Sequence, residues 1–340
     1  MNRRNFLLSS AGTLTACRAR RPRLNVFNWS DYIAPDTVPK FEAEFGVEVR
    51  YGTYESNEEM LARVLSGNSG WDVVFPTDYI VAPMLANALL ARLDHALLPN
   101  LIHVEARFQQ PEWDPTLTWS VPYMVVAAGI AYNRTLSPAP RSWSDLWDNR
   151  LRGRLTMLDD PFDTLGVCLK KLGLSINTSV PGELRRAEAE ALRQKSLVRA
   201  YLNAEVRDQL VSGDVLAAHM WNTTAQQAID SSPNVGFVYP TEGYAVYPDC
   251  AVVLRESKRP DLAHRFLDFL LRPEIAAANA LAARTTTTNG GARTLFPPLF
   301  RDNPTLYPAA DVLARGEWAR TVEPAAQRIR DRIWTEIKSA

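Results

Sequence analysis

Residues 24–46 read LNVFNWSDYIAPDTVPKFEAEFG and join three local patterns in one short stretch. The apolar run Leu24–Trp29 predicts a buried strand. A turn of aromatic and acidic residues follows at positions 29–32. Asp36 is then suited to cap a helix that ends at Gly46, because glycine commonly stops helices. The stretch therefore predicts a strand, a polar turn and a helix in succession, which is the repeating unit of an α/β fold.

The same alternation continues along the chain. Further strand candidates are Val47–Tyr54, Asp72–Phe75, Ala127–Tyr132, Leu155–Leu158, Leu216–Trp221, Val235–Tyr239 and Cys250–Leu254. Helical patterns lie between them, and one begins with a capping-box signature at Ser56 and Glu59. This order argues for α/β layers with mainly parallel sheet. Two segments, Gln110–Pro122 and Thr285–Gly291, are expected to be flexible crossings or loops.

The composition is that of an ordinary globular protein, with 46% hydrophobic and 22% charged residues. At 340 residues the chain is long enough for two domains. The 38 basic residues balance 38 acidic ones, which leaves no electrostatic footprint for nucleic acid. The scattered histidines and cysteines give no metal-ligand spacing, so neither a metal nor another cofactor is expected. Cys168 and Cys250 are candidates for pairing, but two separate buried thiols are favoured.

The N-terminus has the pattern of an export signal over residues 1–17. Arg3 and Arg4 precede a short apolar run, which is typical of a twin-arginine signal. The run is too short to span a bilayer, so we expect it to be cleaved. Leu14-Thr15-Ala16-Cys17 also resembles a lipoprotein signal, which predicts lipid modification of Cys17 and attachment to a membrane surface. The sequence thus predicts a periplasmic or otherwise extracytoplasmic protein.

Acidic and aromatic residues gather where the predicted strands end. In open α/β sheets, ligands bind beyond the carboxyl ends of the strands. The candidates at these positions are Trp29, Ser30, Asp31, Tyr32, Thr77, Asp78, Tyr79, Asp159, Asp160, Asp163, Trp221 and Asn222, with Tyr247 and Asp249 just before the last strand. Carboxylates among aromatic rings suit an organic cation, because ammonium groups take charge-assisted hydrogen bonds and cation–π contacts.

Each candidate also has a purely structural explanation. Asp31 and Asp36 are suited to cap a helix, and Asp160 to end a strand. Trp143 and Trp147 lie on helical faces and are expected in the core, as is Trp334. An enzymatic alternative pairs Asp160 with Asp163 or Asp249 for glycoside hydrolysis, but the sequence gives no separation between the carboxyl groups. The chain contains neither a nucleophile elbow nor a metalloprotease motif, so no enzyme activity is expected.

The chain resembles a known family, the periplasmic polyamine-binding proteins of spermidine/putrescine ABC importers. The resemblance runs from about Leu24 to Lys338. Its most specific pieces are Asn28-Trp29-Ser30-Asp31-Tyr32-Ile33-Ala34-Pro35, Tyr54-Glu55-Ser56-Asn57-Glu58, Trp71-Asp72-Val73-Val74-Phe75-Pro76, Ser142-Trp143-Ser144-Asp145-Leu146-Trp147 and Phe269-Leu270-Leu271-Arg272-Pro273-Glu274. The ordered series over the whole length, rather than any single piece, carries the resemblance.

The resemblance implies a type II-like periplasmic binding protein fold. Two α/β lobes would be joined by crossing strands at a hinge, with the ligand in the cleft between them. Residues 24–126 plus 249–294 would form one lobe, and 127–248 plus 295–340 the other. The protein would be a monomer that captures putrescine or spermidine and delivers it to an ABC permease driven by a cytoplasmic ATPase.

The resemblance also implies roles for individual residues, by matched position. The aromatic walls would come from Trp29, Tyr32, Tyr79, Trp221 and Tyr247. The ammonium groups would bind to Asp31, Asp163 and Asp249, with polar support from Ser30, Thr77 and Asp160. Two departures leave the polyamine open: the family has a ligand-contacting Tyr near Thr285, and the spermidine type has Gln at the position of Ala319. The alternatives are therefore a receptor for another organic cation or amine, or a polyamine sensor subunit without transport.

Overall fold

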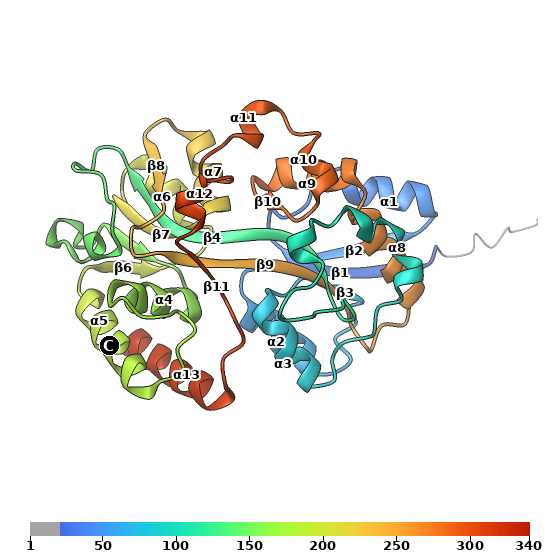
Figure 1. Ribbon diagram of the computed structural model, residues 1–340, viewed down its shortest axis with the longest axis horizontal. Coiled ribbons are helices and arrows are strands. Elements are labelled where there is room, and N and C mark those ends of the chain that lie inside the picture. Colours follow the sequence, from blue (N-terminus) through green and yellow to red (C-terminus); the bar gives the residue numbers. More distant parts are fainter. Residues whose placement is uncertain (1–20) are drawn as a thin grey trace, which may run out of the picture.

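The computed structural model describes residues 21–340. The expected export signal at residues 1–17 and the expected lipidation at Cys17 lie outside the described residues. The chain forms two lobes that lie side by side, with long strands running from one to the other (Figure 1). The strands are β1 (Arg23–Trp29), β2 (Glu48–Tyr54), β3 (Val73–Val74), β4 (Val121–Asn133), β5 (Leu155–Met157), β6 (Val198–Tyr201), β7 (Ala217–Trp221), β8 (Val235–Val238), β9 (Tyr244–Val253), β10 (Thr286–Thr287) and β11 (Gly316–Trp318).

Helices cover the sheet in both lobes (Figure 1). They are α1 (Thr37–Phe45), α2 (Asn57–Leu65), α3 (Asp78–Ala86), α4 (Pro161–Lys171), α5 (Pro181–Lys195), α6 (Val206–Ser212), α7 (Asn222–Ser231), α8 (Pro260–Leu270), α9 (Pro273–Ala283), α10 (Gly290–Arg293), α11 (Pro298–Arg301), α12 (Ala310–Leu313) and α13 (Pro324–Ser339). Short 3-10 helices lie at His95–Leu97, Pro99–His103, Ala106–Phe108, Trp143–Trp147 and Asn149–Leu151. Among residues 21–340, no helix is both long enough and apolar enough to cross a membrane.

The strands are connected in the order β2-β1-β3-β9-β4-β7-β5-β6, with β8 and β10 paired to β4 and β11 paired to β9. The long strands β4 and β9 lie next to each other and cross the middle of the molecule (Figure 1). β1, β2 and β3 continue from them in one lobe, and β5–β8 in the other. Every residue of β9 is buried, so this strand is core in both lobes.

The prediction of a mainly parallel sheet is wrong. Parallel pairing holds at β1 with β2 and β3, at β5 with β6 and β7, and at β9 with β11. β4 runs antiparallel to β7, β8, β9 and β10, and β3 runs antiparallel to β9. The two crossing strands run in opposite directions, so each meets antiparallel neighbours in the lobe that it enters. The α/β layering itself is confirmed.

The prediction of a flexible crossing at Thr285–Gly291 is also wrong. β10 lies inside this segment, pairs with β4 and is buried. Threonine hydroxyls of the segment donate hydrogen bonds to main-chain carbonyls. Thr286 in β10 donates to Leu306, and Thr288 just after β10 donates to Pro122, both at 2.8 Å. Buried hydroxyls that are hydrogen-bonded in this way are tolerated in a core. The composition indicated a flexible crossing or loop because the hydrogen-bond partners of the threonines lie outside the segment.

The second expected loop, Gln110–Pro122, is ordered by one buried carboxylate. Asp114 is 3% exposed and accepts hydrogen bonds from the backbone N–H groups of Thr118, Trp119 and Ser120. The end of the segment already belongs to β4, which begins at Val121. The predicted loop is therefore confirmed up to the residue before Val121. The flexibility that was predicted for this loop is not confirmed.

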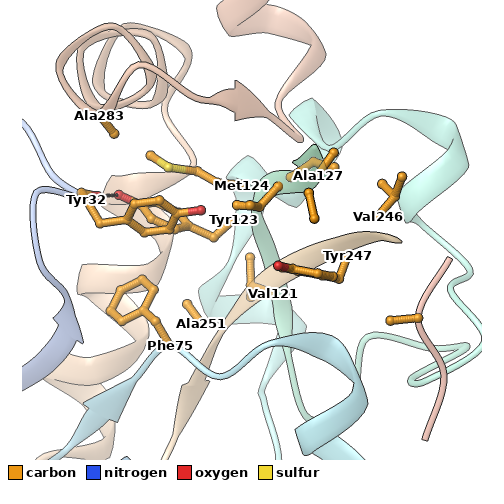
Figure 2. Packing of buried hydrophobic residues seen from close by; sticks show 14 of the residues in the cluster. Tyr32, Phe75, Val121, Tyr123, Met124, Ala127, Val246, Tyr247, Ala251 and Ala283 are labelled. Atoms are coloured by element: carbon orange, nitrogen blue, oxygen red, sulfur yellow. Dashed lines mark hydrogen bonds between the residues drawn. The ribbon is translucent and has the colours of Figure 1, made fainter. Parts of the chain in front are cut away.

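The hydrophobic core continues from the first lobe into the crossing strands. Figure 2 shows the rings of Tyr32, Phe75 and Tyr123 packed together beside β4 and β9. The ring centroids of Phe75 and Tyr123 are 5.0 Å apart, and the Tyr123 hydroxyl donates to the Tyr32 carbonyl at 2.8 Å. Cys168 and Cys250 are separate buried free thiols, as the sequence favoured.

Candidate functional site

Three helices begin directly after strands of the two lobes and point their N-terminal ends at one cavity. α3 follows β3 with Thr77 at its N-cap position, α4 follows β5 and is capped by the Asp160 side chain, and α7 follows β7 with Trp221 at its N-cap position. The cavity measures about 60 Å³. Its lining residues are Trp29, Ser30, Tyr32, Glu55, Asn57, Thr77, Tyr79, Val126, Asp160, Ala204, Trp221, Thr223, Thr224, Tyr247 and Asp249. Nine of the eleven residues predicted as a binding site are among them.

Asp249 lines the cavity and is 4% exposed. The Tyr32 hydroxyl donates to its Oδ2 at 2.7 Å, and the Thr77 hydroxyl donates to its Oδ1 at 2.9 Å. Asn57 in turn donates to the Thr77 hydroxyl at 2.9 Å. Burial raises the pKa of Asp249 to about 7, although the two hydrogen bonds oppose that rise. The group is therefore poised between its neutral and charged forms near neutral pH.

A second acidic feature of the site is a pair of carboxyl groups at the start of α4. Asp160 lines the cavity and caps the helix, since its Oδ1 accepts from the backbone N–H of Asp163 at 2.9 Å. Burial, followed by the charges of Asp163 and Glu58, raises the pKa of Asp160 well above its usual value. Burial also raises the pKa of Asp163, to about 6. Two buried acids at one helix terminus, with no basic partner among residues 21–340, favour binding of a cation.

Asp163 does not line the cavity but contacts two residues that do. Its Oδ2 accepts from Trp221 Nε1 at 2.8 Å and from the Tyr247 hydroxyl at 2.7 Å. Within the described chain, its Oδ1 is buried and has no hydrogen-bond partner. Asp163 therefore orients two rings of the cavity and contributes negative charge from the layer beneath them.

Aromatic rings from both lobes meet across the cavity. Trp29 and Trp221 lie edge to face, with ring centroids 6.5 Å apart. Tyr79 and Tyr247 are 6.3 Å apart and also nearly perpendicular. Outside the lining, Phe162 stacks on Tyr79 with centroids 4.8 Å apart and an interplanar angle of 17°. The rings enclose a slot of the kind that holds an alkyl chain and its terminal charges.

Asp31, predicted to bind an ammonium group, does not line the cavity. It has a positive φ of 52°, which turns its side chain outward to 70% exposure. Its carboxylate lies 4.0 Å from Arg207 of the other lobe. Glu55 lines the cavity close by and accepts a hydrogen bond from Ser30.

Four polar lining residues that the sequence did not single out also lie just beyond strands. Glu55 and Asn57 come shortly after β2, and Thr223 and Thr224 are in the first turn of α7, which follows β7. Their position at strand ends is the signal that could have found them. Val126 and Ala204 carry no chemical signal, because their side chains are apolar.

The charge of the lining decides what the cavity is suited to bind. Glu55, Asp160 and Asp249 line it, and no Lys or Arg of the described part of the chain does. Within residues 21–340 there is no group of three or more His, Cys, Asp or Glu side chains arranged to hold a metal ion. Several carboxyl groups among aromatic rings match an organic molecule that carries positive charge.

The two-lobe fold and the enclosed cleft define a class of extracytoplasmic binding proteins, and comparison with known proteins agrees. The family of bacterial extracellular solute-binding proteins matches residues 36–308, and the chain belongs to this family. The "Putrescine/cadaverine-binding protein" of Pseudomonas aeruginosa is 32% identical over 98% of this chain and 97% of its own length. The "Spermidine/putrescine-binding periplasmic protein" of Escherichia coli is 31% identical over 93% of this chain and 91% of its own length.

Solved structures agree with the fold. A "putative spermidine/putrescine ABC transporter" from Listeria monocytogenes superposes with a TM-score of 0.89, at 29% identity, over 93% of this chain and 98% of that one. A lipoprotein of Treponema pallidum superposes with a TM-score of 0.82, at 27% identity, over 93% and 99%. The predicted type II-like fold and the resemblance to polyamine-binding periplasmic proteins are confirmed.

Proposed function

We propose that this protein captures a polyamine, putrescine or spermidine, in the cavity between its lobes and delivers it to an ABC permease. The observation that carries the proposal is that the carboxyl groups of Asp249 and Asp160, from two different elements, share one cavity with five aromatic side chains, and that among the described residues no basic one lines it. A diamine would supply one ammonium group to each carboxyl group. The names of the two relatives above support the same ligand class.

The proposal assigns residues 24–126 plus 249–294 to one lobe and 127–248 plus 295–340 to the other. The cavity then receives Trp29, Tyr79 and Asp249 from the first lobe and Asp160 and Trp221 from the second. Binding would close the lobes around the ligand. A diamine of six heavy atoms gains at most about −9 kcal/mol, at about −1.5 kcal/mol per atom, so nearly every atom must be contacted. Only a closed cleft provides that many contacts.

The proposal gives the site residues distinct roles. Asp249 and Asp160 would bind ammonium groups directly, and Asp163 would orient Trp221 and Tyr247. The alkyl chain would lie between the rings of Trp29, Tyr32, Tyr79, Trp221 and Tyr247, with Ser30 and Thr77 as polar support. Asp31 is left out of this set, because its side chain is 70% exposed and lies near Arg207.

The remaining parts of the proposal concern the protein's setting. It would act as a monomer, bind without chemical turnover and work outside the cytoplasm. Export would use the twin-arginine-like signal, and acylation at Cys17 would attach the protein to the membrane surface. Membership of an extracellular solute-binding family supports the location, and the Treponema pallidum lipoprotein supports the anchor.

Thermal unfolding of the protein starting at Arg18 tests the ligand class. The panel is putrescine, spermidine, spermine, cadaverine and agmatine, with a sugar as the control. A ligand at one hundred times its dissociation constant stabilises the folded state by about 2.7 kcal/mol, a readily measured shift. We expect a shift with one or two polyamines and none with the sugar. If every amine leaves the transition unchanged, the proposal fails.

A further inference from the structure

A second cavity lies against the same stretch of β4 as the cavity described above, which we call the polyamine pocket. The volume of the second cavity is about 320 Å³, and Val126 lines both. The chain around it runs from α10, beside one lobe, through α11 to α12, beside the other (Figure 1). Arg293 in α10 and Leu313 in α12 both line it. The second cavity therefore borders the crossing strands and a segment that passes between the lobes.

Three arginine side chains line the second cavity, and their charge exceeds that of the acids around them. Arg107 and Arg293 share one carboxylate, that of Glu105, at 2.8 Å and 3.4 Å. Arg301 lies 3.3 Å from Asp302, the acid that lines the cavity. Among residues 21–340, these two acids are the ones that pair with the three guanidinium groups. One positive charge at the cavity is therefore left unbalanced.

The same arginines keep most of their N–H groups available. Within the described chain each donates to the protein through one nitrogen: Nε of Arg107, Nη1 of Arg293 and Nε of Arg301. A guanidinium group carries five N–H donors in a planar fork that matches a carboxylate. The three side chains are between 40% and 47% exposed, so the unused donors are accessible to a ligand.

Aromatic rings hold two of the guanidinium groups in place. The Arg107 guanidinium lies over the Phe108 ring, 4.6 Å from its centroid, and that of Arg293 lies over the Tyr307 ring at 4.9 Å. Contacts of this kind fix the plane of a guanidinium group. Less side-chain freedom is then lost when an anion binds, which favours binding.

Much of the remaining lining is apolar or aromatic. The rings of Tyr239 and Tyr244 both line the cavity, with centroids 4.4 Å apart. Their hydroxyls already donate to the main-chain carbonyls of Thr305 and Val312, so these tyrosines offer a ligand mainly ring surface. Trp318 lines the same space and is 41% exposed. Ring surface of this kind is suited to cover a hydrocarbon group.

We propose that the second cavity binds a small organic carboxylate, whose charged group is held by Arg107, Arg293 and Arg301 and whose hydrocarbon body lies against Tyr239 and Tyr244. The single unbalanced charge suits a monoanion, and the aromatic lining suits the hydrocarbon body. Because the guanidinium groups are partly exposed and water screens their charge, we expect a dissociation constant on the order of millimolar. Binding of the carboxylate does not require the proposed polyamine function.

The test uses protein labelled with 5-fluorotryptophan and followed by ¹⁹F NMR, with no amine present. Trp318→Phe assigns the signal of the second cavity. The probe is phenylacetate. Phenylethanol, which lacks the charge, and acetate, which lacks the ring, are the controls. We expect phenylacetate to shift the Trp318 signal in a saturable transition, and each control to bind about tenfold more weakly or less, because a hydrogen bond to a charged group and a buried ring each contribute more than about 1.4 kcal/mol.

Arg293→Gln and Arg301→Gln should each weaken phenylacetate binding by about tenfold. Arg320→Gln is the matched control, because this arginine does not line the second cavity and pairs with Glu112 at 2.9 Å, and it should bind normally. The Arg301 side chain is 47% exposed, so its variant keeps the test valid even if the Arg293 variant does not fold. The inference is overturned if phenylacetate leaves the Trp318 signal unmoved, if phenylethanol binds equally well, or if the folded Arg301 variant binds like the unmodified protein.

Discussion

The indole Nε1 of Trp221 donates a hydrogen bond of 2.8 Å to Oδ2 of Asp163. The Trp221 ring lines the cavity between the lobes, whereas the Asp163 carboxylate does not line it and lies behind the ring. The same oxygen accepts from the Tyr247 hydroxyl at 2.7 Å. One buried acid thus fixes two rings from different strands, β7 and β9.

Substitutions at Asp163 separate these two contributions. Asp163→Asn keeps an acceptor oxygen but removes the charge, and Asp163→Ala removes both. A hydrogen bond to a charged group contributes about 1.5–3 kcal/mol, so putrescine affinity should fall by about tenfold or more with Asn and further with Ala. Calorimetric titration measures both. Asp208→Asn, at a side chain that is 93% exposed, is the control and should bind normally. Unchanged affinity in the Ala variant would contradict this role.

The shifted pKa of Asp249 predicts an effect on the free protein. Burial raises this pKa from 3.8 to about 7. Between these values the unfolded chain has released the proton and the folded protein has kept it, so this group lowers stability as pH rises. The full shift corresponds to about 4 kcal/mol as an order of magnitude, at 1.36 kcal/mol per pKa unit.

Asp249→Asn should therefore be more stable than the unmodified protein at pH 8 and lose the advantage near pH 4, while binding putrescine far more weakly. Urea unfolding at the two pH values, without ligand, measures the difference. Equal stability of the two proteins at pH 8 would show that Asp249 is ionised there at no cost.

The same groups predict that ligand binding depends on pH. Burial raises the pKa of Asp249 to about 7 and that of Asp163 to about 6, whereas a bound ammonium ion favours their charged forms. Acidic pH must then weaken binding, because protons have to leave before the cation is accepted. We expect putrescine affinity to fall by roughly tenfold between pH 8 and pH 6. Calorimetry in buffers of different ionisation enthalpy should also detect the released protons; binding without proton release would refute the explanation.

The stacked pair of Phe162 and Tyr79 predicts an effect on ligand release. Phe162 is 8% exposed and does not line the pocket, yet its ring stacks on Tyr79 at 4.8 Å. If the two rings come from opposite lobes, as proposed, the stack stabilises the closed form. Because such a pair contributes about 0.5–1.5 kcal/mol, Phe162→Ala should speed putrescine dissociation by up to about tenfold. Phe162→Leu keeps part of the buried surface and should have a smaller effect in stopped-flow displacement. Identical off-rates in all three proteins would exclude this role.

His219 predicts sensitivity to acid. Its side chain is buried next to Trp143, and neither ring nitrogen has a hydrogen-bond partner in the described chain. Burial lowers the pKa of His219 to about 3. From pH 6.5 down to that value the unfolded chain binds a proton that the folded protein does not, so stability falls as pH falls. His219→Leu should reduce the loss of stability between pH 6.5 and pH 4 in urea unfolding, and an unchanged slope would contradict this prediction.

Residues at strand ends could be predicted from the sequence because their position requires only local information. Trp29 and Trp221 are the last residues of β1 and β7, Thr77 and Tyr79 lie shortly after β3, and all four line the cavity. Asp31 follows the same rule but lies outside, since its positive φ turns the side chain toward solvent. Backbone torsion at a single residue leaves no periodic signal, so this exception could not be foreseen.

The crossing strands were the least predictable part of the fold. The sequence suggested a strand at Cys250–Leu254 and placed Tyr247 and Asp249 before it, whereas β9 contains all of these residues except Leu254. Asp249 is a poor strand former, and its place in β9 depends on hydrogen bonds from Tyr32 and Thr77, which are far away in the sequence. Tertiary partners of this kind decide a structure without leaving a local pattern.

The position of β3 determines when the first lobe becomes complete during synthesis. In the sheet, β3 lies between β1 and β9, although β9 follows it by about 170 residues in the chain. Until Tyr244–Val253 has been synthesised, the edge of β3 that faces away from β1 has no neighbouring strand. β4 likewise lacks β9, the strand that runs beside it between the lobes. A free strand edge next to buried apolar residues invites pairing with other chains. A shortened or stalled product would therefore be prone to aggregate, and most of the polypeptide must emerge before either lobe is protected.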